Sequence, residues 1–338
     1  MAFVFLKYCK TLNMKRILGM GNALVDMLVQ IPNDDLLNEI NFPKGSMQLV
    51  DVAQSDAVML KTSDLPIQQL SGGSAGNTVH GIAALGGKTG FIGKVGRDEL
   101  GEFYHNDLKN AGIEATFIES ENSTGKAIAM ITPDSERTFA THLGAAVELS
   151  ADDLKPEMFE NYAIFHIEGY LVQNHELLKK ALQLAKDAGA RVSIDLASFN
   201  VVEANYDFLW DMVKKYVDIL FANEEEAKAF TGLEPDAALA KISDFTEIAI
   251  VKIGKKGALI QSGAEKVAVE AIGQKVIDTT GAGDLFASGF LYGILNDWPL
   301  EKSGKAGAIM AGKIIARIGG RLSTEEILDA KNQINTLS

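Results

Sequence analysis

The sequence has little cysteine and no long apolar run, and both absences restrict its class. Cys9 is the only cysteine among 338 residues. An intramolecular disulfide therefore cannot form, and we expect a protein of the reducing cytoplasm. No stretch reaches the roughly 18 uninterrupted apolar residues that a membrane-spanning helix requires. We expect a soluble protein that has no membrane partner.

Basic residues are scarce relative to acidic ones. The chain has 32 Lys and Arg against 45 Asp and Glu, which gives a formal net charge of −13. Such a chain repels a phosphodiester backbone, so we do not expect nucleic acid as a partner. The five histidines lack the paired spacing that is typical of zinc ligands. We therefore do not expect a zinc site.

The first residues do not fit the pattern of the rest of the chain. Residues 1–13 contain a short apolar run, but they lack the cationic start and the small-residue cleavage site of a secretory signal. The first regular strand pattern follows Met14. We interpret residues 1–13 as an N-terminal extension and residues 14–338 as a single domain, either monomeric or homodimeric.

Short apolar runs alternate with segments of helical spacing through most of the chain. This alternation predicts an α/β fold with a doubly wound, mostly parallel sheet sandwiched by helices and right-handed crossovers. The predicted strands are residues 16–19, 89–93, 163–167, 191–195, 218–222 and 247–253. The predicted helices are residues 75–85, 99–111, 176–188, 202–215 and 224–230.

Two regions, residues about 24–50 and about 114–143, interrupt this alternation. They contain β-like stretches at 126–132 and 137–142, separated by a turn signal at 132–135, and they show no helical pattern of their own. We interpret them as a small β-sheet that projects from the domain and acts as a lid. The alternative is that they are edge strands of the main sheet.

The most informative segment lies near the C-terminus, where residues 278–284 read Asp-Thr-Thr-Gly-Ala-Gly-Asp before an apolar helical pattern. A glycine-rich loop that opens a helix presents N–H groups at the positive end of the helix dipole, which suits a phosphate. Asp284 has two interpretations at this point. It is either a residue that caps the helix or a base that accepts a proton from an attacking hydroxyl.

A second glycine-rich segment, residues 72–77, precedes another apolar helical pattern. Ser74 fits a helix cap. Alternatively, the glycine backbone and the Asn77 amide offer the paired donors and acceptors that sugar hydroxyls require. Asp26 follows the first strand, where on its own it fits an ordinary solvated residue at the end of a strand.

Together these segments resemble the ribokinase/PfkB carbohydrate kinase family, in particular its adenosine-kinase-like branch. The segment at 278–284 is similar to the family signature D-T-x-G-A-G-D, and the segment at 72–77 is similar to its N-terminal signature. The resemblance covers roughly residues 15–325 and implies a ribokinase-like fold. It implies transfer of a phosphoryl group from ATP to the 5′-hydroxyl of a nucleoside, with adenosine as the first expectation. A sugar kinase of the ribokinase or fructokinase type is the alternative, and a non-catalytic nucleoside- or sugar-binding regulator is an alternative of another class.

The resemblance also implies roles for individual residues. Asp284 is the expected base, and Arg137 is either a surface salt-bridge residue or a lid residue that closes over the phosphates. The backbone amides of Gly281, Ala282 and Gly283 are expected to stabilise the transferring charge. The residues expected to bind the acceptor are Asn22, Asp26, Gly72, Gly73, Asn77, Tyr170 and Phe199, and ordinary packing is an equal alternative for the two aromatic ones.

ATP and Mg²⁺ are the cofactors that the resemblance implies. Asn223 and Glu226 fit a capping box, and they also resemble the family's N-x-x-E element, which organises Mg²⁺ largely through water. The nucleotide is expected at Lys252, Gly254 and Gly257, where lysine replaces the threonine of the family's T-x-G-x-x-G stretch. K⁺ is a further candidate at Asp278 and Thr280, because family members bind a monovalent cation near this turn.

Overall fold

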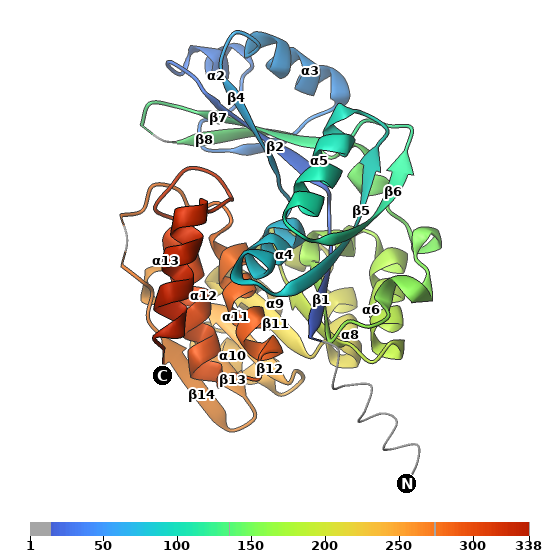
Figure 1. The fold of residues 1–338 in the computed structure, drawn as a ribbon, viewed down its shortest axis with the longest axis vertical. Helices are drawn as coiled ribbons and strands as arrows, with labels where there is room; N and C mark the ends of the chain where they lie inside the picture. Colours follow the sequence, from blue (N-terminus) through green and yellow to red (C-terminus); the bar gives the residue numbers. More distant parts are fainter. Residues whose placement is uncertain (1–14, 135, 274, 338) are drawn as a thin grey trace.

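Two β-sheets, one of nine strands and one of five, form the frame of the molecule (Figure 1). The computed structural model describes residues 15–134, 136–273 and 275–337. The N-terminal extension expected at residues 1–13 lies outside the described residues. Within the described ranges, no helix is long and apolar enough to cross a membrane.

The large sheet confirms the predicted doubly wound architecture. Its strand order is β14-β13-β12-β11-β10-β9-β1-β5-β6, and all neighbouring pairs from β12 to β6 are parallel. Only β13 and β14 add antiparallel pairs at one edge. The strands are β1 (Arg16–Met20), β5 (Lys88–Gly96), β6 (Glu114–Ser120), β9 (Ile164–Glu168), β10 (Arg191–Asp195), β11 (Ile219–Asn223), β12 (Ile248–Lys252), β13 (Ala258–Ser262) and β14 (Glu265–Val269).

Helices cover both faces of the large sheet, because its strands bury apolar side chains on each side. On β11, Leu220 packs in the core beneath α6 and α8, whereas the adjacent Phe221 faces α11, with its ring centroid 5.6 Å from that of Phe290. One face carries α6 (His175–Asp187), α7 (Phe199–Ala204), α8 (Tyr206–Tyr216), α9 (Glu224–Thr231) and α10 (Pro235–Ser243). The other carries α4 (Ser74–Leu85), α11 (Ala282–Leu295), α12 (Leu300–Ile314) and α13 (Thr324–Asn335). The helix predicted at 202–215 is divided into α7 and α8 at Asn205.

The small sheet lies apart from the large one and has the order β3-β8-β7-β2-β4 (Figure 1). Its strands are β2 (Leu24–Gln30), β3 (Met47–Leu49), β4 (Ile67–Ser71), β7 (Gly125–Ile131) and β8 (Arg137–His142). It is not helix-free, since α2 (Asp35–Glu39) and α3 (Val52–Lys61) accompany it. The prediction that residues 114–143 belong wholly to this sheet is wrong for 114–120. That strand is β6, which α5 (Glu99–Asn110) returns to the side of β5 by a crossover.

The chain passes between the small sheet and the rest of the domain at four points, and two of these crossings lie in contact. Residues 21–23 join β1 of the large sheet to β2 of the small one, and residues 72–73 join β4 to the start of α4. Gly73 has φ +84°, and a Cβ there would lie 2.2 Å from the backbone oxygen of Asn22, so the two crossings touch each other. Side chains at both crossings are therefore brought to the gap between the sheets.

The turn between β12 and β13 gives Gly254 and Gly257 a structural role. Gly257 has φ +100°, and a Cβ there would lie 1.9 Å from the carbonyl oxygen of Val269. The left-handed backbone and the close approach both require glycine. The nucleotide-binding role expected for these two residues stays a prediction, and the turn accounts for Gly257 without it.

We expect Gly257→Ala to lower the free energy of unfolding by about 3 kcal/mol or more, because a left-handed alanine and a clash with backbone act together. Gly263→Ala is the matched control. Gly263 has φ +54°, but nothing lies within 4 Å of the position that a Cβ would take there, so only the left-handed cost of about 1–2 kcal/mol applies. Urea unfolding of both variants measures the difference, and equal losses would contradict the steric argument.

Candidate active site

A cavity of about 1120 Å³ opens between the two sheets. On one side it is lined by residues at the carboxyl ends of the parallel strands, including Asp195, Asn223 and Lys252. On the other it is lined by Asp26 and Met47 of the small sheet. Open α/β sheets bind ligands at this edge, and the volume exceeds the roughly 300–1,000 Å³ usual for one small ligand. The cavity is therefore large enough for two substrates together.

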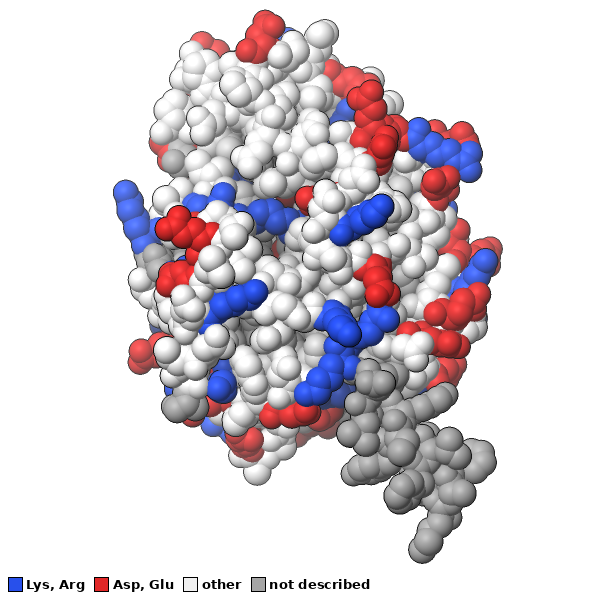
Figure 2. Space-filling model, in the orientation of Figure 1, with Lys and Arg blue, Asp and Glu red and all other residues white. Residues whose placement is uncertain are grey.

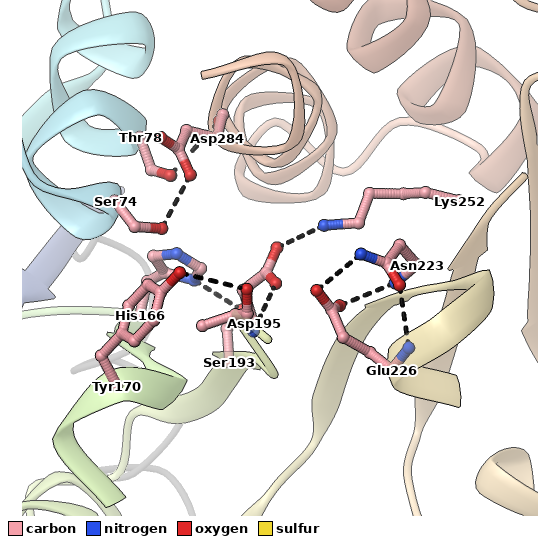
Figure 3. A network of polar contacts seen from close by, with 11 residues as sticks. Ser74, Thr78, His166, Tyr170, Ser193, Asp195, Asn223, Glu226, Lys252 and Asp284 are labelled. Atoms are coloured by element: carbon pink, nitrogen blue, oxygen red, sulfur yellow. Dashed lines mark hydrogen bonds and ion pairs between the residues drawn. The ribbon is translucent and has the colours of Figure 1, made fainter. Parts of the chain in front are cut away.

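Asp284 lies at the floor of this cavity, in the first turn of α11. Its carboxylate accepts a hydrogen bond from Ser74 Oγ at 2.7 Å and another from Asn77 Nδ2 at 2.9 Å. Thr78 Oγ1 donates to the Asp284 carbonyl oxygen at 3.2 Å (Figure 3). The residue that caps α11 is Gly281, and Asp284 makes no capping bond. Of the two interpretations offered for Asp284, the helix cap is therefore wrong.

Burial raises the pKa of the Asp284 carboxyl to about 6, and the hydrogen bonds from Ser74 and Asn77 oppose this shift. A carboxylate with a pKa close to neutral is better matched to accepting and releasing a proton than an ordinary surface aspartate. The geometry and the protonation equilibrium of Asp284 thus both suit a general base.

The glycine-rich loop before Asp284 forms one wall of the cavity. Gly281 adopts φ +73°, and the Nζ of Lys252 lies 3.1 Å from where a Cβ of Gly283 would be. The absence of side chains thus allows a lysine to approach the start of the helix. The N–H of Ala282 donates to the Thr279 carbonyl at 3.1 Å, so in this conformation that amide is engaged within the loop.

The acceptor residues expected from the sequence converge on the small-sheet side. Asp26, Asn22, Gly73 and Asn77 all line the cavity. Gly72 lies behind Asp26, where a Cβ would approach the carboxylate to 2.4 Å. Burial raises the pKa of Asp26 to about 7, with Arg321 opposing the shift and Asp284 adding to it.

Glu168 is a site residue that sequence reasoning missed. Its Oε1 accepts from the backbone N and the Nδ2 of Asn22 at 2.9 and 2.7 Å, and its Oε2 accepts from the Ala75 amide at 3.1 Å. Burial raises its pKa to about 7, although the backbone donors oppose the shift. Glu168 therefore connects the end of β9 to both chain crossings. In the sequence, Glu168 is distinguished only by its position as the last residue of a largely apolar strand.

The nucleotide side contains a buried ion pair that was also missed. Lys252 Nζ lies 2.6 Å from Asp195 Oδ2, which connects the ends of β12 and β10 (Figure 3). Although burial opposes it, Asp195 and then Glu226 raise the pKa of Lys252, so its ammonium stays charged. A charged lysine at the mouth of the glycine loop is able to attract a phosphate.

Asn223 and Glu226 form the capping box of α9 that the sequence predicted. The Asn223 Nδ2 and backbone N donate to the Glu226 carboxylate at 2.7 and 2.8 Å. Burial, followed by the charge of Asp195, raises the pKa of Glu226 to about 7. Among the described residues no three acidic, histidine or cysteine side chains gather as a metal site. Oxygen donors at Glu226 and Asp195 fit Mg²⁺ that keeps most of its waters.

Arg137 is not a surface residue. Only 7% of its side chain is exposed, and its guanidinium lies 2.8 Å from Asp278 Oδ2 and 3.3 Å from Thr280 Oγ1. Asp278 also accepts from the amides of Thr280 at 3.0 Å and Gly319 at 3.2 Å. At the turn proposed for a monovalent cation, the positive charge next to Asp278 is thus the guanidinium of Arg137.

The two aromatic residues expected at the acceptor differ in position. Tyr170 lines the cavity and its hydroxyl donates to the Ala197 carbonyl at 3.4 Å. Phe199 begins α7 and is 40% exposed, and within the described part of the chain it is not one of the lining residues. Its neighbours Ser198 and Asn200 do line the cavity. A contact from Phe199 to a ligand would require its side chain to move.

Comparison with known proteins agrees with this fold and identifies the family. Residues 47–327 match the family described as pfkB family carbohydrate kinase. A probable sugar kinase from Rhizobium etli CFN 42 has a TM-score of 0.85 and 34% identity, covering 95% of this chain and 99% of that one. The adenosine kinase from Sinorhizobium meliloti has a TM-score of 0.83 and 33% identity, covering 94% and 99%. The adenosine kinase of Saccharomyces cerevisiae is 29% identical over 336 residues, covering 92% of this chain and 98% of that protein.

The fold and the site define a kinase of small molecules, with a buried carboxylate beside a glycine-rich helix start at the carboxyl edge of a parallel sheet. The chain belongs to the pfkB family of carbohydrate kinases. It is thus an ATP-dependent phosphotransferase that acts on a hydroxyl group, and the resemblance to the adenosine-kinase-like branch is confirmed.

We expect Asp26→Asn to change how stability depends on pH. The Asp26 pKa is about 7 in the folded protein against an ordinary 3.8. At pH values between these two pKa values, the unfolded chain therefore binds fewer protons than the folded protein. The contribution of Asp26 to stability is lost as the pH rises from the lower pKa to the higher one. Relative to wild type, the free energy of unfolding of the variant should rise from about pH 5 to about pH 7, by up to about 1.4 kcal/mol per pH unit.

Urea unfolding at several pH values, without ligands, measures this difference. Asp56→Asn is the control, because Asp56 is 63% exposed on α3 and pairs with Lys126 outside the site. A variant whose stability relative to wild type stays constant across this pH range would show that Asp26 is not buried as described.

Proposed function

We propose that the protein is a nucleoside kinase that phosphorylates the 5′-hydroxyl of adenosine. The observation that carries this proposal is that the acceptor end of the cavity combines polar groups with several large apolar side chains. The polar residues Asn22 and Asp26 line the cavity, and so do apolar side chains of the small sheet and of the segments that follow it. These apolar lining residues are Met47, Leu49, Leu143, Val147, Leu149 and Tyr170.

A nucleoside matches this combination better than a free sugar does. Its ribose offers two adjacent hydroxyls to a carboxylate, and its flat base buries apolar and aromatic surface. A free sugar carries hydroxyls around its ring and would leave several of them facing apolar walls without partners. The similarity to adenosine kinases over more than nine-tenths of the chain supports the same choice.

In the proposed complex, Asp26 accepts hydrogen bonds from the two ribose hydroxyls. Asn22, Asn77 and the backbone of Gly72 and Gly73 complete the polar contacts. Tyr170 packs against the base, and Phe199 joins it when its side chain turns toward the cavity. ATP binds at the opposite end, with its phosphates directed to Lys252 and its remainder toward the turn at Gly254 and Gly257.

The proposed reaction is a direct transfer between the two substrates. The nucleoside O5′ attacks the γ-phosphorus of ATP, the bond from that phosphorus to the β–γ bridging oxygen breaks, and ADP leaves. Asp284 accepts the proton of the attacking hydroxyl. The amides of Gly281, Ala282 and Gly283 and the charge of Lys252 stabilise the transferring phosphoryl group. Mg²⁺, held through water by Asn223 and Glu226, would neutralise phosphate charge.

The small sheet is proposed to act as a lid. It contributes Asp26 and Met47 to the cavity, while the large sheet contributes Asn223 and Lys252. A ligand that touches both sheets favours their approach, and closure excludes the water that would otherwise hydrolyse ATP. A monovalent cation at Asp278 and Thr280 remains a proposal, alongside the guanidinium already there.

A sugar kinase is the second candidate, favoured by the similarity to the probable sugar kinase of Rhizobium etli CFN 42. Release of ADP on a panel of nucleosides, ribose, fructose and other sugars, each with ATP and Mg²⁺, distinguishes the two. We expect turnover with adenosine at the highest kcat/KM. A higher kcat/KM with any free sugar would contradict the proposal and select the second candidate.

We expect Asp284→Asn to lower kcat by about 10²–10⁴-fold, since the shape is kept and the proton acceptor is lost. In the wild type, kcat/KM should fall below about pH 6, as protonation of Asp284 removes the base. Asp297→Asn is the matched control, because Asp297 is 86% exposed and lies beyond the opposite end of α11 from the loop. A kcat within a few-fold of wild type for Asp284→Asn would refute its role as base.

A further inference from the structure

Arg321 is a buried cation that the account of catalysis above does not use. It follows α12 in the segment 318–322, and only 16% of its side chain is exposed. Its Nη1 donates to Asn77 Oδ1 at 3.2 Å, and its Nη2 donates to the Oγ of Ser71 at 2.7 Å and to the Ser71 carbonyl. The guanidinium thus bridges the last residue of β4 and the first turn of α4.

The bond to Asn77 determines which way that amide faces. An asparagine amide has one acceptor and one donor end, and they are exchanged when the group turns over. Arg321 can only donate, so it requires the Asn77 oxygen on its own side. The Nδ2 is then directed at Asp284 Oδ2, 2.9 Å away. Without Arg321, the hydrogen bond to the Asp284 carboxylate would be the only one of these two contacts left to orient the Asn77 amide.

Arg321 is itself held from a second direction. Its Nη2 lies 4.0 Å from Asp107 Oδ2 on α5, and Asp107 accepts a hydrogen bond from Ser71 Oγ and lies 3.3 Å from His80 Nε2. Gly320 packs beside Asn77, since a Cβ there would lie 3.4 Å from Asn77 Oδ1. These partners hold the guanidinium in one position. Its hydrogen bond to Asn77 Oδ1 therefore fixes the orientation of the Asn77 amide.

We propose that Arg321 is a positioning residue for phosphoryl transfer: it fixes the Asn77 amide, which in turn directs the Asp284 carboxylate at the acceptor hydroxyl. This proposal rests on the proposed role of Asp284 as base. Arg321 is not one of the residues that line the cavity, and it acts through Asn77, which does line it. Its positive charge also favours the ionised carboxylates of Asp26 and Asp107, and it disfavours protonation of His80.

The test is a double-mutant cycle on kcat with adenosine. Arg321→Met in the wild-type background should lower kcat by about 10–100-fold, the usual effect of a misdirected catalytic group. In the Asp284→Asn background the same substitution should cost less than about three-fold, because the carboxylate it orients is gone. The titratable groups facing the guanidinium are Asp26, His80, Tyr104, Asp107 and Asp284, and loss of Arg321 should move the acidic limb of the kcat/KM profile to higher pH.

Two further variants keep the test decisive. Arg317→Met is the matched control, because Arg317 lies in the same region of the chain but pairs with Glu326, and it should keep wild-type kcat. If Arg321→Met does not fold, Arg321→Lys replaces it. The ammonium can still reach Ser71, but it lacks the rigid fork that serves Ser71 and Asn77 together, so kcat should fall in the same direction.

The outcomes separate this proposal from the one it rests on. An active Asp284→Asn enzyme overturns the base assignment and this proposal together. An inactive Asp284→Asn enzyme combined with wild-type kcat in folded Arg321→Met or Arg321→Lys overturns this proposal alone. So does an equal loss from Arg321→Met in both backgrounds, or a loss confined to the KM of adenosine.

Discussion

The contact between the first turns of α4 and α11 is the interaction on which the site depends. α4 begins at the crossing from the small sheet, and α11 begins at the glycine-rich loop. The first turn of α4 thus contains residues proposed to bind the acceptor, and the first turn of α11 contains the proposed base. Ser74 and Asn77 hold Asp284 directly, and further along Gly81 lies so close to Ser288 that a Cβ would be 2.4 Å from its Oγ. The close packing of the two helices fixes the position of Asp284 relative to Ser74 and Asn77.

Charge inside the site is balanced over short distances. Asp26, Glu168, Glu226 and Asp284 have pKa values raised to between about 6 and about 7, chiefly because they are buried. The buried cations Arg137, Lys252 and Arg321 lie among them. On the face shown in Figure 2, acidic and basic side chains are interspersed, so no broad positive surface attracts ATP there. Under the proposed function, the attraction of this acidic protein for a polyphosphate is local and comes from Lys252 and the backbone of one helix start.

The sequence predicted those parts of the structure that depend on neighbours in the chain. Alternation of apolar runs and helical spacing was enough to predict the large sheet, and the glycine-rich segment before Asp284 was enough to predict a loop that opens a helix, which the structure places at the cavity. Strand β6 was misplaced because its strand pattern alone does not say which sheet it joins. The crossover through α5 decides that.

The residues that were missed all act across long stretches of sequence. Glu168 meets Asn22 from 146 residues away, and Arg321 meets Asn77 from 244 residues away. Neither lies in a glycine-rich loop or a capping pattern. The position of Glu168 at the end of a strand is a weak local signal, and Arg321 has none. For Arg137 the residue was identified but its surroundings were not, because the pairing with Asp278 exists only once β8 is placed against the loop before α11.

The Arg137–Asp278 ion pair connects strand β8 of the small sheet to the glycine-rich loop before α11. Arg137 belongs to β8, whereas Asp278 begins the loop that leads to Asp284, and both side chains are at least nine-tenths buried. Separating such a pair leaves a buried charge uncompensated, which typically costs about 3–5 kcal/mol. The small sheet therefore cannot move away from this loop freely. It can do so if another anion takes the place of Asp278 beside the guanidinium, and the phosphate of a bound nucleotide is an anion of suitable charge and geometry. In the proposed mechanism, a phosphate of ATP would then hold Arg137 in place of Asp278, so that the loop is released while the small sheet stays joined to the phosphate end of the cavity.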